Sequence, residues 1–433
     1  MKYSILTNKK HYKNKGKTIL DVMFTLEPQQ VIKEKEDKHL NIALAIDCSS
    51  SMTELAEKNM IRDPEFSINF NHLIHRQPSI NGTKMYYAKK AAIQAILSLK
   101  DEDRVSIIAF DDVAEIIAES VIVQNNKDYL IQRIESIQPR GSTDLHNGWV
   151  YAGKQVASFL NKNLLNRIIL LTDGQTNKGK ILIDDICNDV SVLKSKKIST
   201  STIGVGLDYN EILLEKMAKS GDGNYYYVEK ISELENLFLS EFQDMNFLVG
   251  ENVQLKFLTN EHYKILDCYN DFNQENHVYQ LPNLIHNKKA YLLYQIELQS
   301  KKIPNDFELK AILSWENNGK THERELLLKL SSTDVSSWKK EIENETVVGQ
   351  KAVYVAAREK DKALEALRKG DFMGSTQYLN SAHQVLTSAP ITESTSIALN
   401  ASTKAINLSN NHDYENLKKL ASYQNYQSRN SRN

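Results

Sequence analysis

The chain has 433 residues, and its 54 Lys and Arg nearly balance its 55 Asp and Glu, which gives a formal net charge of -1. One hydrophobic core rarely spans more than about 250 to 300 residues, so this length predicts two or three domains. A balanced charge excludes a general electrostatic attraction to nucleic acid or to an anionic membrane surface. We therefore expect no nucleic-acid partner.

The start of the chain lacks the apolar core of a signal peptide, and no run of about 18 apolar residues could span a bilayer. The three cysteines, Cys48, Cys187 and Cys268, form neither an even set nor a CxxC pair. Cysteines in this number and spacing are typical of reduced thiols, not of a disulfide framework or a zinc site. We expect a cytoplasmic protein without a membrane span, with export by a leaderless route as the alternative.

An alternating apolar pattern marks the first part of the chain, residues 1–37. The residues that share one face of this pattern are Leu20, Val22, Phe24 and Leu26. This pattern predicts one or two strands with a buried face. A charged segment at 33–38 then leads into the next strand.

An apolar run at 41–46 ends at Asp47, which is followed by Ser49 and Ser51 in the spacing DxSxS. A short apolar run that stops at a polar turn predicts a buried parallel strand whose C-terminal loop carries function. Two later loops present similar oxygens. A glycine turn at 140–144 contains Thr143, and a second apolar strand ends at Asp173. Carboxylate and hydroxyl oxygens are the hard donors that Mg²⁺ prefers.

This set of residues resembles the von Willebrand factor type A domain and its metal-ion-dependent adhesion site. The resemblance implies that one divalent cation, Mg²⁺ or else Mn²⁺ or Ca²⁺, is held by Asp47, Ser49, Ser51, Thr143 and Asp173. In this family the hydroxyls bind the ion directly, and one or both aspartates can act through water. The alternative is that Asp47 and Asp173 only cap helices.

In this family a helix follows the metal loop within a few residues, but here the corresponding helix begins only after Gly82. Residues 53–81 are therefore interpreted as an insert beside the metal face. We expect the insert to influence ligand choice, with an ordinary surface elaboration as the alternative. Apolar strands and helical patterns then alternate, which predicts a doubly wound, mostly parallel α/β sheet over residues 38–248.

From residue 249 to 333 the apolar period becomes two, which predicts the antiparallel strands of a β-sandwich. The strands in 1–37 have no other sheet to join, so we expect them to complete this sandwich, with the α/β domain inserted into it. Residues 334–423 predict a C-terminal α-helical region, and 424–433 have the polar composition of a disordered tail. The arrangement resembles bacterial relatives of inter-alpha-trypsin inhibitor heavy chains.

The resemblance implies a metal-dependent protein-binding module. Two carboxylates and neutral hydroxyls leave a bound dication incompletely balanced, so that an Asp or Glu of a partner protein can complete its shell. We expect an adaptor or scaffold in a multiprotein assembly, with a second partner at the C-terminal helices. The alternatives are a metal-dependent hydrolase of the phosphatase or nuclease type, and a purely structural scaffold whose loops are stiffened by the ion.

Catalysis has little support in the sequence. It contains no GxSxG, HExxH or GxxxxGK[ST] motif. The acidic residues Asp111, Asp112 and Asp144 are not spaced in a way that marks a general base. We therefore expect that the protein is not an enzyme.

Overall fold

The computed structural model describes residues 1–28, 39–55, 82–161, 164–230, 233–258, 261–270, 272, 274–275, 277–299, 306–317 and 319–430. The chain forms two compact units. The inserted unit is Glu34–Phe247, and the two-segment unit combines Met1–Lys33 with Leu248–Asn433. One unit is therefore interrupted in sequence by the whole of the other.

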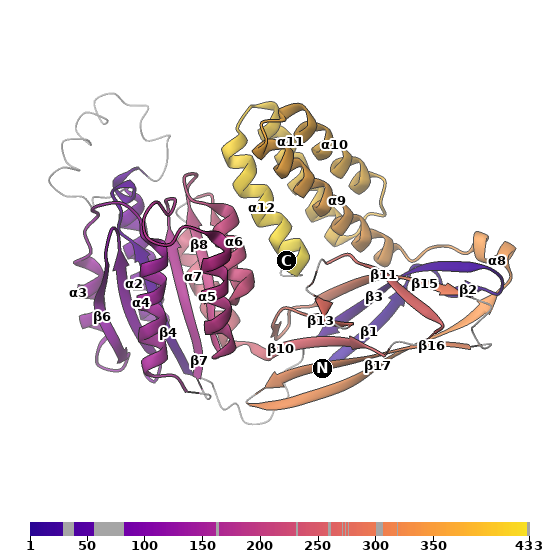
Figure 1. The fold of residues 1–433 in the computed structure, drawn as a ribbon, viewed down its shortest axis with the longest axis horizontal. Helices are drawn as coiled ribbons and strands as arrows, with labels where there is room; N and C mark the ends of the chain where they lie inside the picture. The colour runs from indigo at the N-terminus through magenta and orange to yellow at the C-terminus, as the bar shows by residue number, and fades with distance from the viewer. Residues whose placement is uncertain are drawn as a thin grey trace. The chain divides into compact units, whose positions relative to one another are not determined.

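The inserted unit is built on a six-stranded sheet (Figure 1) with the strand order β6-β5-β4-β7-β8-β9. Strand β6 is antiparallel to β5, and the other neighbours are parallel. Central strands of such a sheet are buried on both faces, which explains their continuous apolar runs. The strands are β4 (His39–Asp47), β5 (Arg104–Phe110), β6 (Ala114–Ile122), β7 (Leu164–Thr172), β8 (Ile198–Val205) and β9 (Asp222–Val228).

Helices cover both faces of this sheet. Trp149 of α4 donates a hydrogen bond to Thr200 of β8 at 3.1 Å, whereas the next residue, Ser201, donates to Glu241 of α7. Successive residues of a strand point to opposite faces, so α4 and α7 lie on opposite sides (Figure 1). The predicted α/β sheet is confirmed. The helices are η1 (Ser50–Thr53, 3₁₀), α2 (Lys84–Ser98), α3 (Lys127–Glu135), α4 (Leu145–Ser158), α5 (Ile183–Ser195), α6 (Glu211–Ser220) and α7 (Leu234–Asn246).

The two-segment unit contains two packed sheets, with the orders β1-β3-β15-β11 and β12-β13-β10-β16-β17-β2, and β14 pairs with β10. All of these pairs are antiparallel except β17 with β2. The strands are β1 (Lys2–Thr7), β2 (His11–Lys13), β3 (Lys17–Glu27), β10 (Leu248–Phe257), β11 (Tyr263–Cys268), β12 (Gln274–Glu275), β13 (Val278–Gln280), β14 (Leu284–Ile285), β15 (Ala290–Gln299), β16 (Asp306–Asn317) and β17 (Lys320–Thr333).

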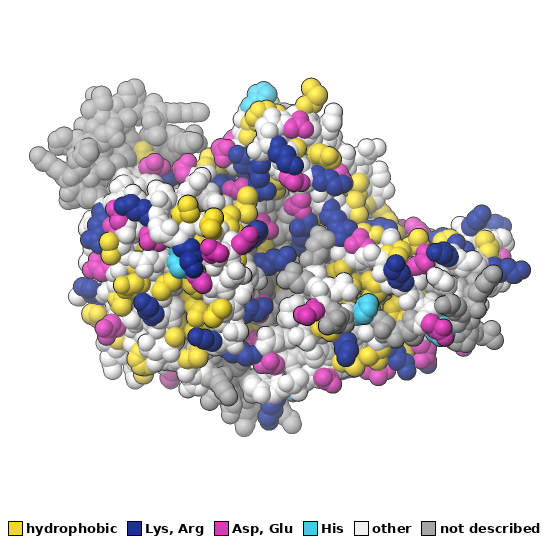
Figure 2. Space-filling view, viewed as in Figure 1, with side chains coloured by type: hydrophobic (Ala, Val, Ile, Leu, Met, Phe, Trp, Pro, Cys, Tyr) yellow, Lys and Arg dark blue, Asp and Glu magenta, His cyan; other side chains and the backbone are white. Residues whose placement is uncertain are grey.

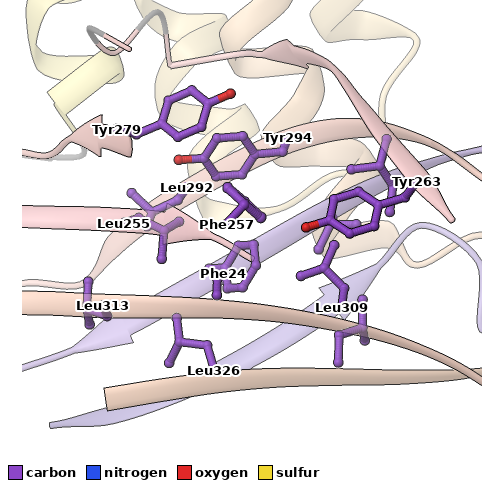
Figure 3. Packing of buried hydrophobic residues seen from close by; sticks show 14 of the residues in the cluster. Phe24, Leu255, Phe257, Tyr263, Tyr279, Leu292, Tyr294, Leu309, Leu313 and Leu326 are labelled. Carbon is purple, nitrogen blue, oxygen red and sulfur yellow. The ribbon is translucent and has the colours of Figure 1, made fainter. Parts of the chain in front are cut away.

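The core between the two sheets is rich in aromatic residues (Figure 3). Phe24 and Tyr294 come from one sheet and Phe257 from the other, and the rings of Phe257 and Tyr294 meet edge to face at a centroid distance of 4.9 Å. Strand β3 joins this unit by pairing with β15 along its length, from Lys17 opposite Gln299 to Leu26 opposite Ala290. The first strands of the chain and residues beyond 248 therefore form one β-sandwich.

Five helices end the chain: α8 (Val335–Lys340), α9 (Glu345–Arg368), α10 (Phe372–Thr387), α11 (Glu393–Asn410) and α12 (Tyr414–Asn430). The predicted disordered tail, 424–433, is wrong over 424–430, which are the last turns of α12; 431–433 lie outside the described residues. Asn425 donates to Asp361 of α9 at 2.7 Å, and Tyr426 is buried. Packing against α9 stabilises a polar helix that composition alone disfavours.

Helix α9 also covers the second face of β3. The predicted buried face of β3 does line the sandwich core, but Met23 on the opposite face is fully buried as well, in a cluster with Val347 and Tyr354 of α9. Asp21 on that face pairs with Lys351 of α9 at 2.9 Å. Sheet and helices are thus packed together within this unit.

Charges of both signs alternate over the face of the molecule drawn in Figure 2, without a continuous patch of one sign. This distribution agrees with the balanced composition. In the described part of the chain, no helix combines the length and apolar character needed to cross a bilayer.

Candidate metal centre

Two neighbouring strands of the inserted unit end at the same edge of the sheet. Strands β4 and β7 are parallel and adjacent, so the loops that follow them, with Asp47 and Asp173, lie side by side. The hydroxyls of Ser49 and Ser51 are 3.0 Å apart, and Ser51 Oγ donates to Asp173 Oδ1 at 2.7 Å. The backbone N–H of Ser49 donates to Asp47 Oδ1 at 2.8 Å. Four of the five predicted ligands are therefore in one continuous chain of contacts.

The fifth predicted ligand, Thr143, reaches the same point from a third loop. A Cβ atom built on Gly174 would lie 3.2 Å from Thr143 Oγ1, 3.6 Å from Ser51 Oγ and 4.0 Å from Asp47 Oδ2. Side-chain oxygens of the DxSxS loop and of the Thr143 loop thus converge on Gly174, which lies in the third loop and has no side chain. The structure brings all five predicted residues together around this glycine.

The Thr143 loop is fixed to the DxSxS loop by backbone hydrogen bonds. The N–H of Arg140 donates to the carbonyl of Cys48 at 2.7 Å, and the N–H of Ser50 donates to the carbonyl of Gly141 at 3.1 Å. Gly141 has a φ of +66°, a conformation that favours glycine. The position of Thr143 therefore depends on this backbone pairing.

Both carboxylates of the site are fully buried. Burial and the nearby charge of Asp173 raise the pKa of Asp47 to about 7, against hydrogen bonds from Thr172 and Ser49 that favour the ionised form. Burial also raises the pKa of Asp173, although Lys84 and Ser51 oppose this shift. The positive charge near these two buried carboxylates is therefore too small to keep both of them ionised at their ordinary pKa values.

Two site residues were missed from the sequence. Lys84, the first residue of α2, places its Nζ 2.8 Å from Asp173 Oδ2 and 2.7 Å from Glu54 Oε2. A lysine in the first turn of a helix opposes the helix dipole, and this unusual position is the signal that could have identified it. The hydroxyl of Thr172, at the end of β7, donates to Asp47 Oδ2.

Comparisons with known proteins identify the family of the inserted unit. The sequence model of the von Willebrand factor type A domain matches residues 73–239. An uncharacterized protein of Synechocystis sp. is 31% identical over 202 residues, which are 46% of this chain and 47% of that protein. The inter alpha-trypsin inhibitor heavy chain 4 of Mus musculus is 24% identical over 229 residues, 48% of this chain and 24% of that protein.

The inserted unit is a von Willebrand factor type A domain. A solved structure, von Willebrand factor type A from Catenulispora acidiphila, matches with a TM-score of 0.66 at 15% identity over 94% of this chain and 88% of that one. This match extends the shared fold to the sandwich and the helices. The chain spans less than half of the length of the two curated relatives.

The donor set of this type A domain fits a hard divalent cation. Two carboxylates and three hydroxyls provide only oxygen ligands, which suit Mg²⁺, Mn²⁺ or Ca²⁺. Among the described residues, no three or more His, Cys, Asp or Glu side chains gather in a way that could hold a metal. A site in the described part of the chain would therefore depend on the hydroxyls.

The acidic residues nearest to this set all have structural contacts. Asp111 accepts from Arg140 at 2.7 Å, and Asp112 pairs with Lys178 at 3.0 Å. Asp144 caps α4 by accepting from the N–H of Asn147 at 3.0 Å. Each carboxylate thus already serves to hold a loop or a helix end.

The predicted insert, 53–81, is mostly outside the described residues, which stop at 55 and resume at 82. An isolated β-bridge joins Leu55 to Thr83. The two ends of the insert therefore lie next to each other, beside η1 and the start of α2. Its influence on ligand choice stays a prediction.

Proposed function

We propose that the type A domain binds one divalent cation, Mg²⁺ or else Mn²⁺ or Ca²⁺, and through it captures an Asp or Glu of a partner protein. The ligands are Asp47, Ser49, Ser51, Thr143 and Asp173. The supporting observation is the convergence on Gly174 of oxygens from the DxSxS loop and the Thr143 loop, which lie 3.2 to 4.0 Å from a Cβ position built on this glycine.

The chemistry of the ligands favours capture of a carboxylate. Mg²⁺ retains several waters in most protein sites, and these exchange for oxygen ligands of a partner. Three of the five side chains are neutral hydroxyls, and Lys84 already contacts the carboxylate of Asp173 at 2.8 Å. The buried side chains together with a bound dication therefore keep a net positive charge. A partner carboxylate that replaces a water adds both a ligand and the missing negative charge.

Contacts within the site argue against the two alternative functions. The loops are joined directly, by Ser51 to Asp173 and by Arg140 to Cys48, so an ion is not required to hold them together. A hydrolase would need a general base, but the nearby acids Asp111 and Asp112 are engaged with Arg140 and Lys178. We therefore propose a binding protein and not an enzyme.

The wider role that we propose is an adaptor or scaffold in a multiprotein assembly in the cytoplasm, with a second partner at the helices α9 to α12. No disulfide involves Cys48, Cys187 or Cys268, which suits a reducing compartment. Cell fractionation tests the location. Capture experiments that compare the wild type with Met373→Glu and Ile397→Glu, which change exposed side chains of α10 and α11, test the second partner.

Calorimetric titration of the metal-free protein with Mg²⁺ and with Mn²⁺ tests the site. We expect one site in the wild type and at least a tenfold loss of affinity in Asp47→Ala and Thr143→Ala, because each removes a ligand. Asp184→Ala is the matched control, since it removes an equal charge from a side chain that is 90% exposed. Equal binding by Asp47→Ala and the control would refute the site.

Affinity capture with and without EDTA then separates the three functions. Partner capture predicts that EDTA, Asp47→Ala and Thr143→Ala all abolish binding of the same protein while the fold persists. A purely structural ion predicts a lower unfolding temperature in Asp47→Ala without selective loss of that partner. A hydrolase predicts turnover of a phosphate ester or nucleic acid that Asp47→Ala abolishes.

A further inference from the structure

Lys84 is a fixed cation next to the proposed ligands. Its side chain is only 7% exposed, and its Nζ contacts Asp173 Oδ2 at 2.8 Å. The backbone N–H of Lys84 donates to the carbonyl of Glu54 at 2.9 Å, and a Cβ on Gly206 would lie 3.6 Å from Lys84 Cε. The lysine is therefore held at both its backbone and the end of its side chain.

The ammonium group uses the oxygen of Asp173 that faces away from the hydroxyls. Asp173 Oδ1 accepts from Ser51 Oγ at 2.7 Å, whereas Oδ2 accepts from Lys84. The three oxygens that border the space beside Gly174 belong to Thr143, Ser51 and Asp47. Lys84 therefore adds its charge to the site without taking the place of a ligand in that space.

We infer that Lys84 determines the ligand charge that the centre accepts: it weakens metal binding and keeps the metal-loaded centre positive, so that the loaded centre requires an anionic ligand. This inference rests on the proposed function and specifies its selectivity. Among the buried side chains of the centre, Asp47 and Asp173 contribute two negative charges and Lys84 one positive charge. The carboxylates of Glu54 and Asp208 lie 2.7 and 3.9 Å from Lys84 Nζ, but these side chains are 57% and 70% exposed, so solvent screens their charges. A dication then brings the buried centre to a net charge of +1, and one carboxylate brings it to zero.

Without Lys84, the net charge of the metal-loaded centre would be different. Two carboxylates and a dication would already be neutral, and an added carboxylate would leave a buried negative charge. Burying an unbalanced charge is costly, so the carboxylate would bind less well. Loss of Lys84 should therefore strengthen metal binding and weaken carboxylate binding, two effects of opposite sign.

The test is Lys84→Met in the full chain, with Mn²⁺ as the metal probe and acetate as the carboxylate probe. Electron paramagnetic resonance of free Mn²⁺ gives the metal affinity, and water-proton relaxation reports the water that acetate displaces from bound Mn²⁺. At constant ionic strength, adjusted with chloride, we expect Mn²⁺ to bind about ten- to a hundredfold more tightly and acetate about tenfold more weakly. Lys84→Arg should behave like the wild type.

Glu54→Gln provides a second test that does not disturb a buried residue, because the Glu54 side chain is 57% exposed. This change removes a negative charge beside Lys84, so its effects should be opposite to those of Lys84→Met. We expect Mn²⁺ to bind about two- to threefold more weakly and acetate about two- to threefold more tightly. The effects are modest because solvent screens the exposed charge of Glu54. Gln at this position still accepts a hydrogen bond from Lys84.

The outcomes separate this inference from the proposed function. If the wild type binds neither Mn²⁺ nor, through it, acetate, the proposed function fails. If the wild type binds both, but Lys84→Met or Glu54→Gln changes the two affinities in the same direction or not at all, Lys84 is only a structural lysine and the inference is overturned. Should Lys84→Met not fold, Glu54→Gln decides the question alone.

Discussion

Two of the buried acidic centres of the type A domain differ in how their charge is balanced. At the strand ends, Asp173 contacts Lys84 and Ser51, whereas Asp47 accepts from Thr172. On the face covered by α7, Glu241 is equally buried but is surrounded by donors. These donors are Arg167 at 2.7 Å, Asn224 and Tyr226 at 2.6 Å and Ser201 at 2.5 Å.

The consequence of this difference is seen in the two pKa values. Burial alone would raise the pKa of Glu241, but Arg167 and the hydrogen-bond donors hold it below its ordinary value. Burial and the charge of Asp173 raise the pKa of Asp47 to about 7. The same domain can therefore provide a buried carboxylate, Glu241, with enough positive charge and hydrogen-bond donors to keep it ionised. The shortage of positive charge at the strand ends supports the proposed cation site.

Disrupting the charge-balanced centre around Glu241 should have the largest effect on stability. Arg167→Met leaves Glu241 as a buried charge without its cation, and we expect a loss of about 3 to 5 kcal/mol in the free energy of unfolding. Urea unfolding followed by circular dichroism measures it. Arg324→Met, which changes an exposed arginine of the other unit, is the matched control. A loss below about 1 kcal/mol would show that Glu241 is not balanced as described.

Metal binding should raise the free energy of unfolding only through the centre of Asp47 and Asp173. At a Mg²⁺ concentration 100 times its dissociation constant, the wild type should gain about 2.7 kcal/mol in the free energy of unfolding. Asp47→Asn should gain at most about 1.4 kcal/mol, because the lost ligand weakens Mg²⁺ binding at least tenfold. Arg167→Met should show the full gain of the wild type, although it starts from a lower stability. Thermal unfolding with Mg²⁺ and with EDTA compares the three proteins. A gain in Asp47→Asn equal to that of the wild type contradicts the assignment.

The two centres should respond to pH with opposite signs in the metal-free protein. Native Asp47 binds its proton up to about pH 7, above its ordinary pKa, so its contribution makes stability fall as pH rises from about 4 to 7. Glu241 has a lowered pKa, so its contribution is present above the ordinary pKa of a glutamate and is lost as pH falls through its native value.

Asp47→Asn isolates this pH effect. Above pH 7 in EDTA, the variant should be more stable than the wild type by about 1 to 3 kcal/mol, the size of a buried polar group without full compensation. Near pH 4 the difference should disappear, because the aspartate is then protonated as well. Stability curves at several pH values provide the measurement, and a difference that is independent of pH would contradict the raised pKa.

A smaller effect is expected from filling the space beside Gly174. In Gly174→Ala the new methyl group would lie 3.2 Å from Thr143 Oγ1, and we expect Mg²⁺ affinity to fall about five- to tenfold, or about 1 kcal/mol. Gly349→Ala is a matched control, since its Cβ would meet Thr392 at 3.1 Å in the other unit. Equal metal affinity in both variants would show that the space does not serve the ion.

The sequence was sufficient to predict that the five candidate ligands lie close together, because each lies in or next to a recognisable strand end or glycine turn. Their role as metal ligands stays a proposal. Lys84 was missed because residues 53–81 separate it from the DxSxS loop, although the fold brings it to Asp173. The buried position of Glu241 could not be predicted from the sequence either. It is one of several polar residues on its helix, and only the packing of the fold places it against Arg167. Local patterns predict strand ends, but they do not specify which distant charge meets them.

The error at the end of the chain has a related cause. The segment beyond residue 423 is rich in polar residues, and such composition predicts disorder when the segment is considered alone. In the structure Asn425 and Arg429 bind Asp361, one turn from residues of α9 that contact the sandwich. The burial of the second face of β3 by α9 was missed as well, because the alternating pattern predicts only one buried face, that of Leu20, Val22, Phe24 and Leu26.

The interruption of the sandwich by the type A domain also has a consequence for synthesis on the ribosome. Strand β3 emerges early, but its partner β15 begins only at Ala290, after the complete inserted unit has been translated. Domains generally fold as units while the chain grows. The type A domain should therefore be finished first, while β3 exposes the apolar side chains of Phe24 and Leu26 to the chaperones that bind nascent chains.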